Sequence, residues 1–258
     1  MESHAASDLD LLIVLDDRRT TVSDETAEAL FNEVWYRIDA ASLDAPRPKP
    51  GGVFSQCVSW RALTDLNVRG IVNEDVTTFG QRMQLLLDAQ PVLDHQSFGD
   101  LQAELLNWYT ETRVSNLFEE AEPFGWLRQD VQRYWRSIWS RAYWLYEDDA
   151  GKSIEVNVKL RSSRAAIMAA FLQAIDIAQN TRGATSEAVA ALQRQLTTTP
   201  LERLTAELSA SVASELLYSY QTVWHFLAGR RSTDSSFPQE IRDALVSLHR
   251  WLPGSVTE

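Results

Sequence analysis

The apolar residues of this 258-residue chain change their spacing along the sequence, from short runs near the N-terminus to helical periodicity further on. Residues 9–15 (L-D-L-L-I-V-L) form a short apolar run of the kind found in buried strands. Residues 27–41 place apolar side chains three and four positions apart, which predicts a helix capped by Thr21 or Ser23. After a loop rich in proline and glycine, residues 53–59 favour a second strand. The first segment is therefore predicted to be strand, helix and strand.

From about residue 76 the periodicity is helical almost throughout, and prolines stand at several of the junctions. Helices are predicted over residues 76–90, 97–118, 127–147, 157–181, 184–197, 200–229 and 238–251. The expected fold class is α+β, with a small α/β domain over residues 1–75 followed by a larger all-α domain over residues 76–258.

Composition and charge narrow the classes of protein further. Hydrophobic residues make up 45% of the chain, which is enough for a sizeable core, and no apolar run approaches the ~20 residues of a membrane span. Cys57 is the single cysteine, which excludes an internal disulfide and favours a reducing, cytoplasmic setting. The net charge of −12 argues against broad binding to nucleic acid, although a small basic pocket remains compatible with it.

Asp8 and Asp10 stand two residues apart at the front of the first apolar run. In a strand, residues at this spacing point to the same side, so the two carboxylates can share a Mg²⁺ ion, which prefers oxygen ligands. The alternative is an ordinary strand end with two solvated acids, because the pattern D-x-D is short.

The stretch S-D-L-D-L-L-I-V, followed by an amphipathic helix, resembles the metal-binding strand of the nucleotidyltransferase superfamily related to DNA polymerase β. That superfamily includes the bacterial uridylyltransferases that modify the PII signalling protein. Later stretches resemble, in the same order, segments of a group of uncharacterised bacterial nucleotidyltransferase-like proteins. These stretches are residues 48–60, 79–92, 124–138 and 158–164. The resemblance spans roughly residues 7–170, and the order of the pieces carries more weight than any one of them.

The resemblance implies a Mg²⁺-dependent transfer of a nucleoside monophosphate from a nucleoside triphosphate to an acceptor, with Asp8 and Asp10 holding the metal. The superfamily takes a third carboxylate from a later strand, but residues 53–59 contain none, and Asp44 is the nearest substitute. The superfamily also has a Gly-Ser pair, which holds the triphosphate and should stand about a dozen residues before the first aspartate. Counting back from Asp8 passes Met1, so either the start is truncated or this copy is degenerate.

Basic residues outnumber acidic ones by three between residues 127 and 164, in a chain that is acidic as a whole. Arginine binds phosphate oxygens through paired hydrogen bonds. Contacts to phosphate or to the acceptor are therefore expected from Arg133, Arg136, Lys159 and Arg161. Ion pairs between one helix and another, with Asp130 paired to Arg133 within their own helix, are an equally weighted alternative.

Two functions of different classes remain open from the sequence. The first is an enzyme that uses a nucleoside triphosphate and an unidentified acceptor, for which a protein is one option. The second is a decayed nucleotidyltransferase-like protein that acts as a binding or regulatory module, with a homodimer as one expected form. The spacing of Arg242 and His249 resembles that of small helical ribonucleases, but so loose a pattern is more often an ordinary surface helix.

Overall fold

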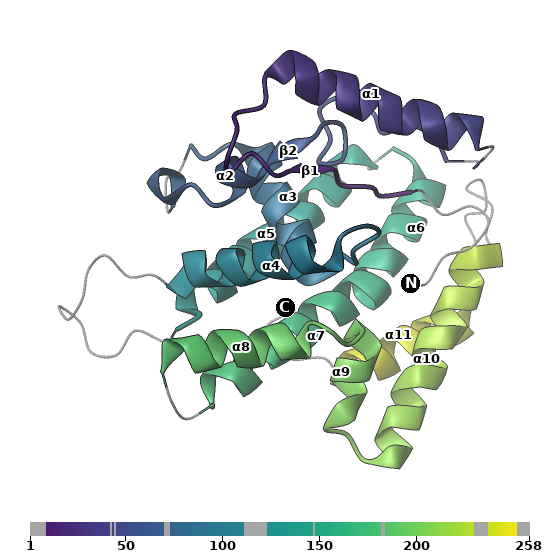
Figure 1. Cartoon of the computed structure of the whole chain (residues 1–258). Coiled ribbons are helices and arrows are strands. Elements are labelled where there is room, and N and C mark those ends of the chain that lie inside the picture. The colour runs from purple at the N-terminus through teal and green to yellow at the C-terminus, as the bar shows by residue number, and fades with distance from the viewer. Residues whose placement is uncertain are drawn as a thin grey trace. The chain divides into compact units, whose positions relative to one another are not determined.

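The computed structural model describes residues 9–41, 43, 45–69, 73–110, 123–146, 148–181, 184–229 and 237–251. These residues are mostly helical, with one two-stranded parallel sheet (Figure 1). A small α/β part and a larger helical region were expected, and this coarse description is confirmed. The contacts within the chain divide it into two compact units, Met1–Trp108 and Tyr109–Glu258. The expected boundary at residue 75, as a division between functional domains, stays a prediction.

The sheet of the first unit consists of β1 (Val14–Leu15) and β2 (Val58–Ser59), with Val14 opposite Val58. Between them runs α1 (Asp24–Ala40), and Ser23 caps it by accepting a hydrogen bond from the backbone N–H of Thr26. This confirms one of the two predicted caps.

Both strands are shorter than the predicted runs 9–15 and 53–59. The chain before β2 is turned rather than extended, since the backbone N–H of Ser55 donates to the carbonyl of Gly52. Only two residues of β2 therefore remain to pair with β1.

The remaining helices of the first unit are α2 (Trp60–Leu63), η1 (Leu66–Val68), α3 (Val76–Leu87) and α4 (His95–Thr110), whose last two residues belong to the second unit. One of these helices, α3, holds the turned segment before β2 in place. The Gln81 side chain donates to the carbonyl of Val53 at 3.0 Å. A Cβ at Gly80 would lie only 2.7 Å from a Val53 methyl group, so glycine is what allows α3 to approach the turn before β2.

The second unit is helical in all its described elements. Its elements are α5 (Gly125–Leu145), α6 (Ala150–Lys159), the π-helix η2 (Leu160–Arg164), α7 (Ala165–Gln179), α8 (Thr185–Gln195), α9 (Pro200–Ala206), α10 (Ala210–Gly229) and α11 (Gln239–Trp251). Ten of the fifteen residues of α7 are buried, and α7 packs against α8 and α9. A helix with so many buried apolar residues belongs in a core, so α7 is the central helix of this unit.

Two predicted helices differ from the observed ones. The helix expected over residues 157–181 begins earlier, at Ala150, and contains the π-helix η2 between α6 and α7. The helix expected over residues 200–229 is broken between α9 and α10, and this break lets α9 pack on α7 while α10 packs on α11. Within the described ranges, no helix is long and apolar enough to cross a membrane.

Candidate functional site

Of the three predicted metal-binding carboxylates, Asp10 is the one that the structure describes. Asp8 and Asp44 lie outside the described residues. Asp10 is exposed, on a segment without regular structure that leads into β1, and it stands four residues before the first ladder pair at Val14. A solvent-exposed carboxylate is an oxygen ligand of the kind that Mg²⁺ binds. Asp10 therefore fits a metal-ligand role, while its pairing with Asp8 stays a prediction.

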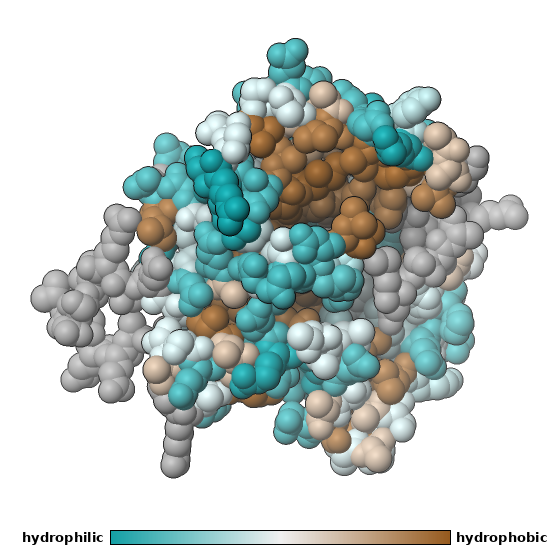
Figure 2. All heavy atoms as spheres, in the orientation of Figure 1, coloured by the Kyte–Doolittle hydropathy of each residue, from teal (hydrophilic) through white to brown (hydrophobic). Residues whose placement is uncertain are grey.

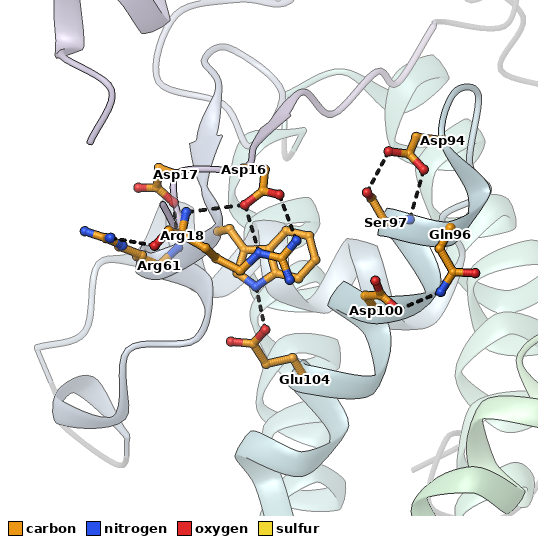
Figure 3. A network of polar contacts seen from close by, with 10 residues as sticks. Asp16, Asp17, Arg18, Arg61, Asp94, Gln96, Ser97, Asp100 and Glu104 are labelled. Carbon is orange, nitrogen blue, oxygen red and sulfur yellow. Dashed lines mark hydrogen bonds and ion pairs between the residues drawn. The ribbon is translucent and has the colours of Figure 1, made fainter. Parts of the chain in front are cut away.

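A dense polar network lies directly after β1. Asp17 is buried, with 7% of its surface exposed. One of its carboxylate oxygens accepts a hydrogen bond from the Ser59 hydroxyl at 2.5 Å, and the other accepts from the backbone N–H of Arg61 at 3.1 Å. Asp17 thus joins the end of β1 to the junction of β2 and α2 (Figure 3).

Arg18 closes this network on its exposed side (Figure 3). Its guanidinium donates to both carboxylate oxygens of Asp16, at 2.8 and 2.7 Å, and lies 3.7 Å from the centre of the Trp60 ring. The Trp60 indole N–H in turn donates to Glu104 at 2.8 Å. The hydrogen bond from Arg18 lowers the pKa of the Asp16 carboxyl to about 2. The charge of Asp16 is therefore matched by Arg18.

The network lies at the carboxyl ends of two parallel strands, which is where α/β proteins commonly place their ligand sites. Here, however, the carboxylates of Asp16 and Asp17 already bind groups of the protein. The network fixes the loop after β1 to the start of α2. The sequence signal for this contact was a serine at the end of the second strand, Ser59, and an aspartate just after the first strand, Asp17.

Two of the four predicted phosphate-binding residues form ion pairs within their own helices. Arg133 lies 3.3 Å from Asp130, which also accepts a hydrogen bond from the Tyr109 hydroxyl at 2.8 Å. Lys159 lies 2.9 Å from Glu155. Burial acts to raise the pKa of the Glu155 carboxyl, but hydrogen bonds from Lys159 and Lys152 lower it overall. The ion-pair alternative therefore describes the local contacts of Arg133 and Lys159.

Arg136 and Arg161 have a different environment. Both are exposed, and neither forms an ion pair with a described residue. The Arg161 guanidinium lies 5.2 Å from the centre of the Trp139 ring, so it is held by a cation–π contact between η2 and α5. These two arginines keep their charge available for an anionic ligand.

Arg161 lies in the π-helix η2 and contacts two other helices. The backbone carbonyl of Arg161 lies 3.2 Å from the Nε2 atom of His249 on α11, and its side chain contacts Trp139 on α5. Burial lowers the pKa of His249, which favours the neutral imidazole that donates Nε2–H to this carbonyl. Short π-helical segments occur frequently at functional sites. The sequence gives no clear signal for this irregularity.

The Cys57 thiol and clusters of metal-binding side chains are two further features to consider. Burial raises the pKa of the Cys57 thiol, which disfavours the reactive thiolate, as expected for a small half-buried side chain. In the described ranges, no group of three or more histidine, cysteine, aspartate or glutamate side chains is arranged to hold a metal ion.

Comparisons with known proteins leave the relationship of this chain open. No family model matches the sequence, no curated protein matches it, and no solved structure matches its fold.

Proposed function

We propose that this chain is a Mg²⁺-dependent nucleotidyltransferase that moves a nucleoside monophosphate from a nucleoside triphosphate to an acceptor. The observation that carries the proposal is the position of Asp10. This exposed carboxylate precedes a strand that pairs in parallel with the strand after α1, and the segment carrying it has the sequence that resembles the superfamily's metal-binding strand. Asp8 is its proposed partner, and Asp44 is a candidate third carboxylate.

The proposed reaction joins an acceptor oxygen to the α-phosphorus of the triphosphate. The bond from the α-phosphorus to the oxygen bridging the α and β phosphates breaks, pyrophosphate leaves, and the acceptor proton passes to solvent or to a carboxylate. When bound, Mg²⁺ would neutralise phosphate charge and polarise the bonds to phosphorus. Asp8 and Asp10 would hold the metal, and a third carboxylate such as Asp44 would help to remove the acceptor proton.

Contacts to phosphate groups are assigned chiefly to Arg136 and Arg161. Neither has an acidic partner among the described residues, so binding an anion breaks no existing ion pair. Arg133 and Lys159 would first have to leave Asp130 and Glu155. They are therefore proposed as weaker contributors to the same contacts.

Calorimetric titration with each of the four common nucleoside triphosphates, in the presence of Mg²⁺, tests these roles. Asp10→Asn is expected to weaken Mg²⁺-dependent binding by about tenfold or more, equivalent to about 1.4 kcal/mol per factor of ten. Asp39→Asn is the matched control, because Asp39 is an exposed aspartate elsewhere in the first unit, on α1. Equal weakening by both variants would contradict a specific role for Asp10.

The same titration tests whether Arg136 contributes to nucleotide binding. Arg136→Gln is expected to weaken binding about tenfold, as for the loss of a charge-assisted hydrogen bond. Arg194→Gln is the control, because Arg194 is an exposed arginine on α8. A fall in thermal stability with unchanged nucleotide affinity would mean that Arg136 has a structural role only. Absence of any nucleotide binding by the wild-type chain would favour the decayed binding module instead.

A further inference from the structure

One edge of β1 is open within the part of the chain that the structure describes. The backbone N–H of Val58 donates to the carbonyl of Ile13 at 2.9 Å, and Val14 stands opposite Val58. In a parallel ladder, a residue bonds to the two neighbours of the residue opposite it. The backbone groups of Leu12 and Val14 therefore point away from β2, and no described residue pairs with them.

The side chains around this edge are apolar and incompletely covered. All the residues from Leu11 to Leu15 are half-buried, although a continuous apolar run is typical of a strand buried on both faces. In Figure 2, apolar atoms gather in the upper part of the face shown, where Figure 1 draws β1 and α1. The loop before α4 adds two large exposed side chains, Val92 at 73% and Leu93 at 83%.

Acidic groups surround the carboxyl end of the same strand. The charge of Asp16 acts on the carboxyl group of Asp94, and the charges of Asp100 and Glu104 act on Arg18, so these groups lie within electrostatic range of one another (Figure 3). The four carboxylates at this end outnumber the guanidinium groups of Arg18, Arg19 and Arg61. Asp10 is exposed at the other end of the run. A segment with basic residues at both ends complements this distribution.

A second copy of this chain fits the edge less well in the antiparallel register centred on Ile13. Antiparallel pairing of two β1 strands about Ile13 would place Asp10 of each copy opposite Asp16 of the other. Like charges directly opposite in a sheet are destabilising. The edge therefore favours a partner whose charge is opposite to that of this acidic chain.

We propose that β1 accepts an added strand from a partner protein, in the form of an extended segment with alternating aliphatic side chains and lysine or arginine residues at both ends. Main-chain hydrogen bonds to Leu12 and Val14 provide affinity, as in other cases of strand addition. Aliphatic side chains cover the half-buried run together with Val92 and Leu93, and the basic ends meet the surrounding carboxylates. This docking does not depend on nucleotide transfer.

A peptide pair tests the backbone part of the proposal on the full chain. The probe is a labelled peptide of sequence KKVTVTVKK, and its binding is followed by fluorescence anisotropy. Two further versions of this peptide carry N-methyl groups on alternate residues. One version lacks the N–H donors of one edge of the peptide, and the other version lacks those of the opposite edge. One methylated version is expected to lose at least tenfold in affinity while the other binds like the parent. Equal affinities of the two versions, whether both bind or neither does, would overturn strand addition.

A second comparison tests the charge part of the proposal. The peptide EEVTVTVEE is expected to bind at least tenfold more weakly than KKVTVTVKK, and added salt is expected to weaken the basic peptide. Equal binding of the acidic peptide would contradict the proposed charge of the partner. Concentration-dependent dimerisation that competes with the peptide would identify a second copy as the occupant instead.

Variants of the chain test whether the peptide binds at β1. Val14→Pro removes an N–H that faces the open edge and leaves the ladder to β2 intact, so it is expected to reduce peptide binding at least tenfold. Val92→Ser is expected to weaken binding about threefold, by loss of part of one apolar side-chain contact. Val76→Ser is its control, because Val76 is also highly exposed, at 77%, and lies at the start of α3. Equal effects of the two serine variants would contradict the assigned surface.

Discussion

At the scale of single residues, the neighbouring carboxylates of Asp16 and Asp17 have opposite environments. Asp16 is half-exposed and matched by Arg18, whereas Asp17 is buried and accepts two hydrogen bonds from the junction of β2 and α2. The sequence could not separate them, because the partners of Asp17 follow it by more than forty residues. Only the parallel pairing of β1 and β2 brings these groups together.

Replacement of Asp17 by alanine is expected to lower the free energy of unfolding by about 1–3 kcal/mol, because the Ser59 hydroxyl and the Arg61 N–H lose their acceptor. Urea unfolding followed by circular dichroism measures this change. Asp16→Ala is the control and is expected to change stability little, since surface ion pairs contribute little. Similar losses in the two variants would contradict the buried role of Asp17.

His249 is expected to make the stability of the chain sensitive to pH. Its pKa in the folded state lies below the ordinary value of 6.5, so the unfolded state binds more protons once the pH falls below that value. The stabilisation is therefore fully present above 6.5 and is lost as the pH falls towards the folded-state pKa. Urea unfolding between about pH 7.5 and pH 5 measures this loss.

His249→Gln should reduce this pH dependence. His225→Gln is the matched control, because it removes an exposed histidine on another helix, α10. A wild-type slope that survives in His249→Gln would assign the pH dependence to another group.

At the scale of secondary structure, helix starts could be predicted where a capping residue precedes an amphipathic face. Ser23 before α1 and Pro200 in the first turn of α9 are examples. The π-helix η2 could not be predicted, because its residues continue the periodicity of the helices on either side. The break after α9 also depends on tertiary packing, since α9 and α10 contact different helices.

The capping box of α9 is expected to contribute measurably to stability. The Thr199 hydroxyl accepts from the backbone N–H of Glu202, and the Glu202 carboxylate accepts from the backbone N–H of Thr199 at 2.8 Å. Thr199→Ala is expected to lower the free energy of unfolding by about 1 kcal/mol. Thr199→Ser keeps the hydroxyl and should lose much less, as measured by thermal or urea unfolding. Equal losses would mean that the methyl group, rather than the cap, is responsible.

At the scale of the whole molecule, composition and periodicity were sufficient to predict a small strand-containing part and a larger helical region. They could not predict which charged residues are neutralised by neighbours. Arg133 and Arg136 occur on one helix three residues apart, yet only Arg133 has an acidic partner among the described residues. The difference arises because Asp130 lies within reach of Arg133 and is held there by Tyr109. The sequence named all four candidate phosphate contacts, and the structure was needed to separate the two that form ion pairs, Arg133 and Lys159, from Arg136 and Arg161.

The proposed function requires the chain to bind a nucleoside triphosphate through Mg²⁺, and calorimetry measures this binding. Each of the four common triphosphates is titrated by calorimetry into the wild-type chain, once with Mg²⁺ and once with a chelator. The proposed function predicts saturable binding of at least one triphosphate that is present with Mg²⁺ and lost with the chelator. Absence of binding at millimolar nucleotide with Mg²⁺, or equal affinity in the chelator, would contradict it.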